Sequence, residues 1–282
     1  MSEARSSSEG RDFAATATAY FRDLQARLCG AFEAFEPVSR FEKRSWTKPA
    51  GHRLQGGGEA RLMRGAVFEK VGVNVSHVWG ILAPEARGQV AGAKESDGRF
   101  VACGISLVAH MMNPYVPAVH MNLRYLSTSR AWFGGGSDLT PTFPFPEDTE
   151  AFHAALRAAC DRYRPDAYPE FKAWCDRYFY LPHRQEPRGV GGIFFDDLAG
   201  PDPAADFAFV RSVGEALLAV YPMIVARHKD TPYDEAARER LLVKRGRYVE
   251  FNLVYDRGTK FGFSTDADPD AYLMSLPPLV KW

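Results

Sequence analysis

The feature that most constrains the fold is a set of segments in which apolar residues alternate with polar or small ones. Val71, Val73 and Val75 alternate in this way, and the pattern returns over residues 100–110 and 116–125. A β-strand turns successive side chains to opposite faces, so a period of two is typical of strands with one buried face. The chain is therefore expected to fold around a sheet. Further strand candidates are residues 178–183, 192–196 and 248–255.

Segments with helical periodicity fill the gaps between these strands. In the first, apolar residues from Phe13 to Phe35 recur every three or four positions, and Pro37 ends the helix. The polar stretch 47–58 contains the glycine triplet 56–58 and is expected to be a loop. Further helices are expected over residues 147–163, 168–179 and 206–227, and from Pro232 to just before Gly246.

No repeat of fixed period is visible, and no linker divides the chain. Its 282 residues can bury a large core. We expect a single-domain α+β fold, with a large, mostly antiparallel sheet flanked by helices on both faces. This domain is expected to span residues 11–282, behind a polar and disordered tail of residues 1–10.

Charge and cysteine usage narrow the class of protein. The chain has 35 basic and 35 acidic residues, and this balance excludes a broad electrostatic footprint for nucleic acid. No signal peptide is visible, and the most apolar run, residues 216–226, is shorter than a membrane span. Four scattered cysteines are expected to be buried thiols in a reducing compartment, which predicts a cytoplasmic protein.

The strand over residues 117–125 carries the strongest chemical signal. Alternation places His120, Asn122 and Arg124 on one face and apolar side chains on the other. A merely solvated face would favour Lys, Glu and Thr, yet periodicity alone leaves the functional and the solvated interpretation equally open. If the preceding strand pairs with this one, Ser106 and His110 join the same wall. An arginine fork there suits a substrate carboxylate.

Other candidate residues have weaker support. His153 and His183 are isolated, and a lone histidine is more often structural; spacing gives no support for a metal site built from them. The glycine triplet 134–136 permits either a close backbone approach to a ligand or a wide turn. Asp196 and Asp197 face opposite ways on a strand, so at most one is expected to enter a cleft. The absence of nucleotide-binding and nucleophile motifs argues against organic cofactors.

The segments that carry these residues closely resemble the oxygen-dependent coproporphyrinogen III oxidase family of haem biosynthesis. They follow the family's order and cover most of the chain: residues 68–76, 104–110, 119–124, 132–141, 178–184, 188–198, 247–262 and 274–278. The resemblance implies a homodimeric cytosolic enzyme that converts two propionates of coproporphyrinogen III to vinyl groups and yields protoporphyrinogen IX. Molecular oxygen is the implied co-substrate, and carbon dioxide and hydrogen peroxide are the implied by-products.

The resemblance also implies roles for single residues. His120 corresponds to the proton donor, and Ser106, Asn122, Leu123 and Arg124 correspond to substrate contacts. A divalent metal is implied at His110, His120, His153 and His183. We further hypothesise that Asp196 or Asp197 accepts hydrogen bonds from pyrrole N–H groups during catalysis.

The chain departs from the family where residues 266–268 read Asp-Ala-Asp in place of a Gly-Gly-Arg-like substrate loop, and where it ends at Trp282. These changes are expected to affect one pocket edge or the dimer. Two alternatives remain: a non-catalytic tetrapyrrole-binding homologue, and a metal-dependent hydrolase that uses the four histidines.

Overall fold

A computed structural model describes residues 2–264 and 269–282 and is built on one seven-stranded antiparallel sheet. The strand order is β1-β2-β3-β4-β5-β6-β9, so the first six strands are neighbours in sequence and in space. A two-stranded hairpin, β7–β8, precedes the last strand. The strands are β1 Glu42–Thr47, β2 Leu54–Met63, β3 Phe68–Ile81, β4 Arg99–Met111, β5 Ala118–Ser127, β6 Ala131–Thr140, β7 Tyr180–Leu181, β8 Glu186–Pro187 and β9 Gly191–Leu198.

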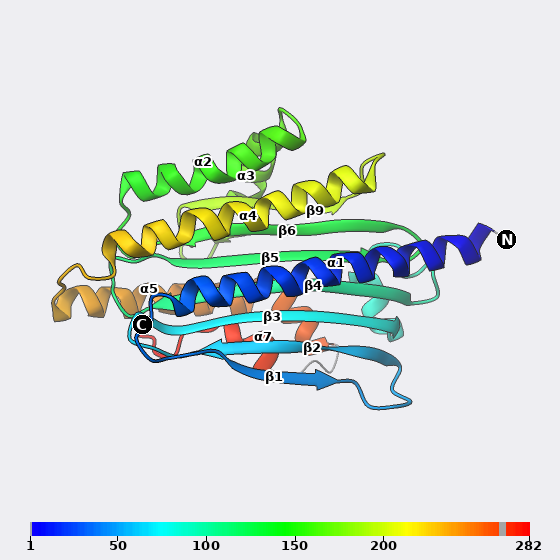
Figure 1. Ribbon diagram of the computed structural model, residues 1–282, viewed down its shortest axis with the longest axis horizontal. Helices are drawn as coiled ribbons and strands as arrows, with labels where there is room; N and C mark the ends of the chain where they lie inside the picture. The colour runs from blue at the N-terminus through cyan, green and yellow to red at the C-terminus, as the bar shows by residue number, and fades with distance from the viewer. Residues whose placement is uncertain (1, 265–268) are drawn as a thin grey trace.

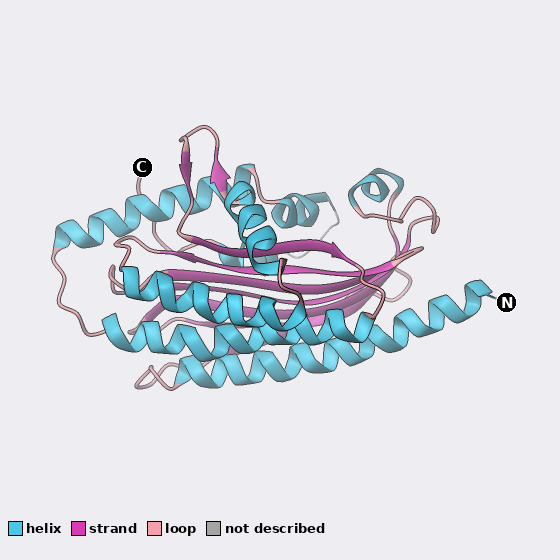
Figure 2. Ribbon diagram, turned by 90° about the horizontal axis from the view of Figure 1, so that it is seen from above, coloured by secondary structure: helices cyan, strands magenta, loops and turns pink. Residues whose placement is uncertain are grey.

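Helices cover both faces of this sheet, which confirms the expected α+β class (Figure 2). On one side lie α1 (Ser2–Glu33), α2 (Pro146–Tyr163) and α4 (Pro203–His228). On the other lie α5 (Glu235–Val254), α6 (Arg257–Ser264) and α7 (Pro269–Tyr272), drawn in orange to red behind the sheet in Figure 1. The remaining elements are α3 (Ala167–Tyr178), which packs on β9, and the 3-10 helices η1 (Pro84–Gln89) and η2 (Leu273–Ser275).

The main core lies between the sheet and α1, α2 and α4. Val73, Leu107 and Met121 turn from three adjacent strands to this side and are fully buried. Phe21 and Leu24 of α1 meet them along one helical stripe. Burying each such side chain contributes about 1.5–3 kcal/mol. This layer fixes the sheet register, because a slip of one residue would turn the apolar side chains to the opposite face.

One helix, α4, is long and apolar enough to cross a membrane by length and composition alone, contrary to the expectation from residues 216–226. Of its most apolar window, 56% is buried inside the structure. Val213 and Leu217 belong to the main core. This is the placement of a core helix.

Three local expectations were wrong because pairing and packing override composition. The triplet 56–58 lies within β2 rather than in a loop. Residues 131–140 form β6, so of the two alternatives left open for the triplet 134–136 the wide turn is excluded. Residues 248–254 continue α5, and Gly246 lies inside that helix. The strand expected over 178–183 shrinks to the two residues of β7. In each case short-range composition competes with long-range packing, which decides the structure.

The four cysteines are free and buried, as expected. Burial raises the pKa of Cys29 and Cys160 to about 12, so neither is a thiolate near neutral pH. Helix α1 is described from Ser2 onward. The division into a tail at 1–10 and a catalytic domain at 11–282 stays a prediction.

Candidate active site

The candidate site lies on the side of the sheet that faces α5 and η2, which we call the polar face. Strand register brings its side chains together, because residues directly opposite each other on paired strands share a face. Ser106 pairs with Asn122, and His120 pairs with Asp138. Arg124, two residues after Asn122 on β5, lies opposite Gly134. Ser106, His120, Asn122 and Arg124 therefore share one face, as expected, and β6 adds Asp138 to it, whereas the expected fifth member, His110, is buried.

His120 is held by a buried carboxylate. Its Nδ1 lies 2.8 Å from Oδ1 of Asp138, and the other carboxylate oxygen of Asp138 accepts a 2.7 Å hydrogen bond from Nη2 of Arg188. The pKa of Asp138 lies below its usual range: burial opposes ionisation, but the charge of Arg188 and the hydrogen bonds from His120 and Arg188 outweigh it. The ionised carboxylate orients the imidazole and leaves its Nε2 free to meet a ligand.

Arg188 is buried within a cage of aromatic rings. Its guanidinium carbon lies 4.0 Å from the ring centre of Phe179, 4.4 Å from Tyr248 and 4.7 Å from Phe251. Its Nη1 donates to Oδ1 of Asn252 at 3.1 Å. A guanidinium buried in this way needs both the ring faces and a carboxylate partner, so the cage fixes Asp138 and through it His120.

A second charged group lies at the Arg124 end of the polar face. Arg124 donates to Asp196 at 2.8 Å and to Oδ1 of Asn122 at 3.0 Å, and Asp196 also accepts from Arg257 at 3.0 Å. A Cβ at Gly134 would lie 2.5 Å from Oδ1 of Asp196 and 2.7 Å from Nη2 of Arg124, so a larger residue there would displace this pair from its present position. The triplet 134–136 thus permits a close approach, although it forms a strand.

The structure separates the two adjacent aspartates. Asp196 is directed to the polar face and its side chain is 18% exposed. Asp197 adopts a left-handed backbone conformation, with φ of 52°, and pairs with Arg130 at 2.6 Å while 55% exposed. Asp196 is therefore the better placed of the two to meet a ligand.

The four histidines expected as metal ligands do not converge. Nε2 of the buried His110 bonds to the Ser275 carbonyl, and the ring of His153 lies between the Val190 carbonyl and the Tyr168 hydroxyl. His183 lies between Tyr255 and Glu250. Within residues 2–264 and 269–282, no group of three or more His, Cys, Asp or Glu side chains is arranged to hold a metal ion. These residues do not fit one metal centre.

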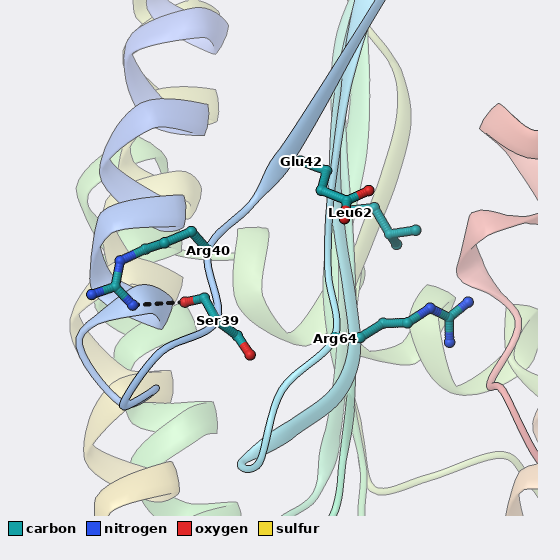
Figure 3. A pocket seen from close by; sticks show the side chains of 5 residues that line it. All are labelled: Ser39, Arg40, Glu42, Leu62 and Arg64. Carbon is teal, nitrogen blue, oxygen red and sulfur yellow. Dashed lines mark hydrogen bonds between the residues drawn. The ribbon is translucent and has the colours of Figure 1, made fainter.

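Three further predicted features fall away from the polar face. Leu123 turns its fully buried side chain into the main core, so only its backbone is available to a ligand. Residues 266–268 lie outside the described residues. A cavity of about 330 Å³ lies at the β1 edge (Figure 3), and another of about 400 Å³ lies beside α5; neither is lined by a predicted site residue. The β1-edge cavity is lined by Ser39, Arg40, Glu42, Leu62 and Arg64.

Sequence reasoning missed the residues that organise the site from a distance. Asp138 was noted only beside its glycines, and neither Arg188, Arg257 nor Asn252 was singled out. Arg188 lies 50 positions from Asp138, so no spacing rule joins them. The available signal was the presence of all four in the segments that carry the family resemblance.

Comparison with known proteins identifies the family of the chain. A profile of the coproporphyrinogen III oxidase family matches residues 16–282. The oxygen-dependent coproporphyrinogen-III oxidases of Rickettsia conorii and Rickettsia peacockii are each 52% identical over 274 residues, which cover 94% of this chain and 96% of theirs. The enzyme of the same name from Rickettsia bellii is 50% identical over 274 residues, with the same coverage. The chain belongs to the coproporphyrinogen III oxidase family.

Proposed function

We propose that the protein catalyses the oxygen-dependent oxidative decarboxylation of two propionate groups of coproporphyrinogen III, which yields protoporphyrinogen IX. For each propionate, a C–H bond at the carbon next to the pyrrole breaks, together with the C–C bond to the carboxylate. Carbon dioxide leaves and a vinyl double bond forms. The two electrons released reduce oxygen, which takes up two protons and becomes hydrogen peroxide. One of these protons comes from the C–H bond, so one more must be supplied.

The observation that carries this proposal is the row of His120, Asn122 and Arg124 on one partly exposed face, in a chain of this family. Arg124 is the natural partner of a substrate carboxylate, because a guanidinium binds a carboxylate through two parallel hydrogen bonds. Asn122 accepts from Arg124 and keeps it oriented. Ser106, on the neighbouring strand, offers a hydroxyl to the same carboxylate.

His120 is proposed to supply the proton. Its Nδ1 is occupied by Asp138, so Nε2 is the nitrogen that exchanges a proton with the reacting groups. Its position opposite Asp138 on adjacent central strands fixes the ring with little freedom. No step of this proposal passes through a metal ion.

Asp196 is proposed to accept hydrogen bonds from pyrrole N–H groups. Its carboxylate already bridges Arg124 and Arg257, and it retains 18% exposure toward a ligand. The shared carboxylate also sets the distance between the two guanidiniums, so binding of the macrocycle and binding of its propionate are linked. Asp197 does not share this role, because its side chain is 55% exposed and pairs with Arg130.

The remaining parts of the proposal follow from the family. We infer a homodimer in the cytoplasm, with a tetrapyrrole as substrate, oxygen as co-substrate and no organic cofactor. A reduced tetrapyrrole is electron-rich, so it can give electrons to oxygen without a flavin or nicotinamide.

The test is a comparison of aerobic and anaerobic incubation of metal-stripped protein with coproporphyrinogen III, following the vinyl product and peroxide. We expect product only when oxygen is present, and without added metal. Two molecules of carbon dioxide and two of peroxide should form for every protoporphyrinogen. Turnover without oxygen that appears only when a divalent metal ion is added back would favour the metal-dependent hydrolase alternative. Tight substrate binding without turnover under any condition would favour a non-catalytic homologue.

A further inference from the structure

In the middle of the polar face, two adjacent rows of residues are partly exposed, and their members on β2, β3 and β4 have short side chains or none. One row crosses the sheet from Gly58 through Ser76 and Gly104 to Arg124. The members of a row share a face, since each is the direct partner of the next. We call the two rows together the trough. The second row consists of Ala60, Asn74, Ser106 and Asn122.

Three sides of the trough are closed by packed side chains. Toward β9, Phe194 and Phe251 belong to a buried aromatic cluster that covers the sheet. Beyond the Arg124 row, Trp132 packs into a second cluster with residues of η1. Beyond the Asn122 row, Met274 lies over Gly72, where an added Cβ would be 2.3 Å from its sulfur. Among the residues that the structure describes, the short side chains beside Arg124 therefore lie toward β4, β3 and β2.

Two residues of β1 border the fourth side: Arg44, opposite Ala60, pairs with Asp270 of α7 at 2.9 Å, and Trp46 covers the other row. Trp46 lies directly opposite Gly58, and its indole covers that glycine: a Cβ on Gly58 would be 2.8 Å from Cζ2 of the ring. The indole is half-buried, so part of it remains available to a ligand. Four strand spacings of about 4.8 Å separate β1 from β5, which puts roughly 19 Å between the strands of Trp46 and Arg124.

We propose that Trp46 is a substrate-positioning residue that packs against a pyrrole ring remote from the reacting propionate. The inference rests on the proposed function. With one propionate at Arg124 and the reacting carbon near His120, the aromatic cluster at β9 blocks the macrocycle on that side. The small residues of the trough lead it instead toward the indole, and a tetrapyrrole with its propionates has a span comparable to the trough. Aromatic contacts of this kind stabilise a complex beyond the area they bury.

The first test is Trp46→Ala beside Trp46→Phe, with Trp79→Ala as the matched control. Trp79 is a second tryptophan, on β3, but alternation places it on the opposite face of the sheet, where it is 41% exposed. We expect Trp46→Ala to raise KM roughly 3- to 10-fold, with kcat changed less than twofold, and Trp46→Phe to recover most of the loss. Trp79→Ala is expected to leave both constants unchanged.

The second test fills the trough from its floor. Ser76→Leu adds a large apolar side chain between Gly58 and Gly104, on the partly exposed face of β3. We expect it to raise KM at least tenfold while the thermal unfolding temperature stays within a few degrees of the wild type. A direct readout is the quenching of tryptophan fluorescence when coproporphyrin III binds. This quenching should be weaker in the Trp46→Ala and Ser76→Leu variants than in the wild type.

The outcomes separate this inference from the proposed function. A wild-type protein without turnover or binding of coproporphyrinogen III refutes the function. An active wild type in which Trp46→Ala and Ser76→Leu are folded and keep the wild-type KM refutes the inference alone. An equal loss in Trp79→Ala and Trp46→Ala would also overturn it, because the effect would then not depend on the face to which the tryptophan turns.

Discussion

One face of the sheet forms the main core and the other forms the candidate site, although the same strands supply both. On β5, Val119 and Met121 enter the main core and are at most 1% exposed, whereas the residue that follows each of them, His120 and Asn122, stays partly exposed. The apolar face needs only shape and hydrophobicity, which many residue combinations provide. The polar face needs particular partners at particular distances. Stability and chemistry are thus separated by alternation along a single strand.

The separation is incomplete at one place, where the polar face carries its own buried ion pair. Asp138 and Arg188 have side chains that are each 2% exposed, and their atoms lie 2.7 Å apart. A buried pair contributes little net stability when intact, but removal of one partner leaves an uncompensated buried charge. At this point a change in the catalytic face also reaches the stability of the whole domain.

The largest predicted effect comes from breaking this pair. Asp138→Asn is expected to lower the free energy of unfolding by about 3–5 kcal/mol, because Arg188 loses its counter-ion. Turnover per folded molecule should fall on the order of 100-fold or more, since His120 loses its orienting carboxylate. Urea unfolding and steady-state kinetics measure the two effects.

The matched control for Asp138→Asn is Asp148→Asn. Asp148 is also a buried carboxylate, and it bonds to Arg227 at 2.8 Å on the opposite side of the sheet. We expect a smaller loss of stability, because Arg227 is 36% exposed and stays hydrated when its partner is neutralised, and no loss of turnover per folded molecule. A loss of turnover equal to that of Asp138→Asn would contradict the special role of the polar face.

The next prediction compares neighbours on β4. Leu107→Ala should cost about 2–5 kcal/mol of unfolding free energy, because a fully buried core side chain is replaced by a cavity. The kcat and KM of the folded fraction should stay at the wild-type values. Ser106→Ala should show the reverse: a small change in stability and a raised KM. If both variants changed KM alike, the two faces would not be independent.

The face pattern could be predicted from the sequence because alternation is local, and this is why Ser106, His120, Asn122 and Arg124 were placed together correctly. The supporting shell could not, because its members meet only through long-range packing. The segment 248–255 shows the same limit: it has an apolar pattern compatible with a strand, yet it folds as the end of α5. There Tyr248 and Asn252, one turn apart, reach the polar face.

The third prediction concerns the pH dependence of the unfolding free energy, to which His110 on the polar face contributes. Burial, with the nearby charge of Arg245, lowers the pKa of His110 to about 3, so the folded protein keeps it neutral. The unfolded chain binds a proton near pH 6.5. The unfolding free energy should therefore fall as pH drops from 6.5 toward 3, with a slope of up to about 1.4 kcal/mol per pH unit from this group.

Denaturant titrations at several pH values between 7 and 4.5 check this slope. In His110→Gln the pH dependence of the unfolding free energy should lose the contribution of one proton. The variant is expected to be less stable at pH 7, because glutamine does not reproduce the hydrogen bond between Nε2 of His110 and the Ser275 carbonyl. An unchanged slope would show that His110 titrates in the folded state as it does in water.

The smallest predicted change in stability separates the two adjacent aspartates, and it is also the sharpest test of the polar face. Asp197→Asn should change the unfolding free energy by less than about 1 kcal/mol, because its ion pair with Arg130 is exposed and asparagine tolerates a positive φ. Its KM and kcat should match the wild type. Asp196→Asn keeps the shape of its side chain but weakens its hold on Arg124 and Arg257, so kcat/KM should fall at least tenfold. Because the two substitutions are chemically identical and one residue apart, their difference isolates the face to which each side chain turns. Equal kinetics in the two variants would remove Asp196 from the site and leave Arg124 to be positioned by Asn122 alone.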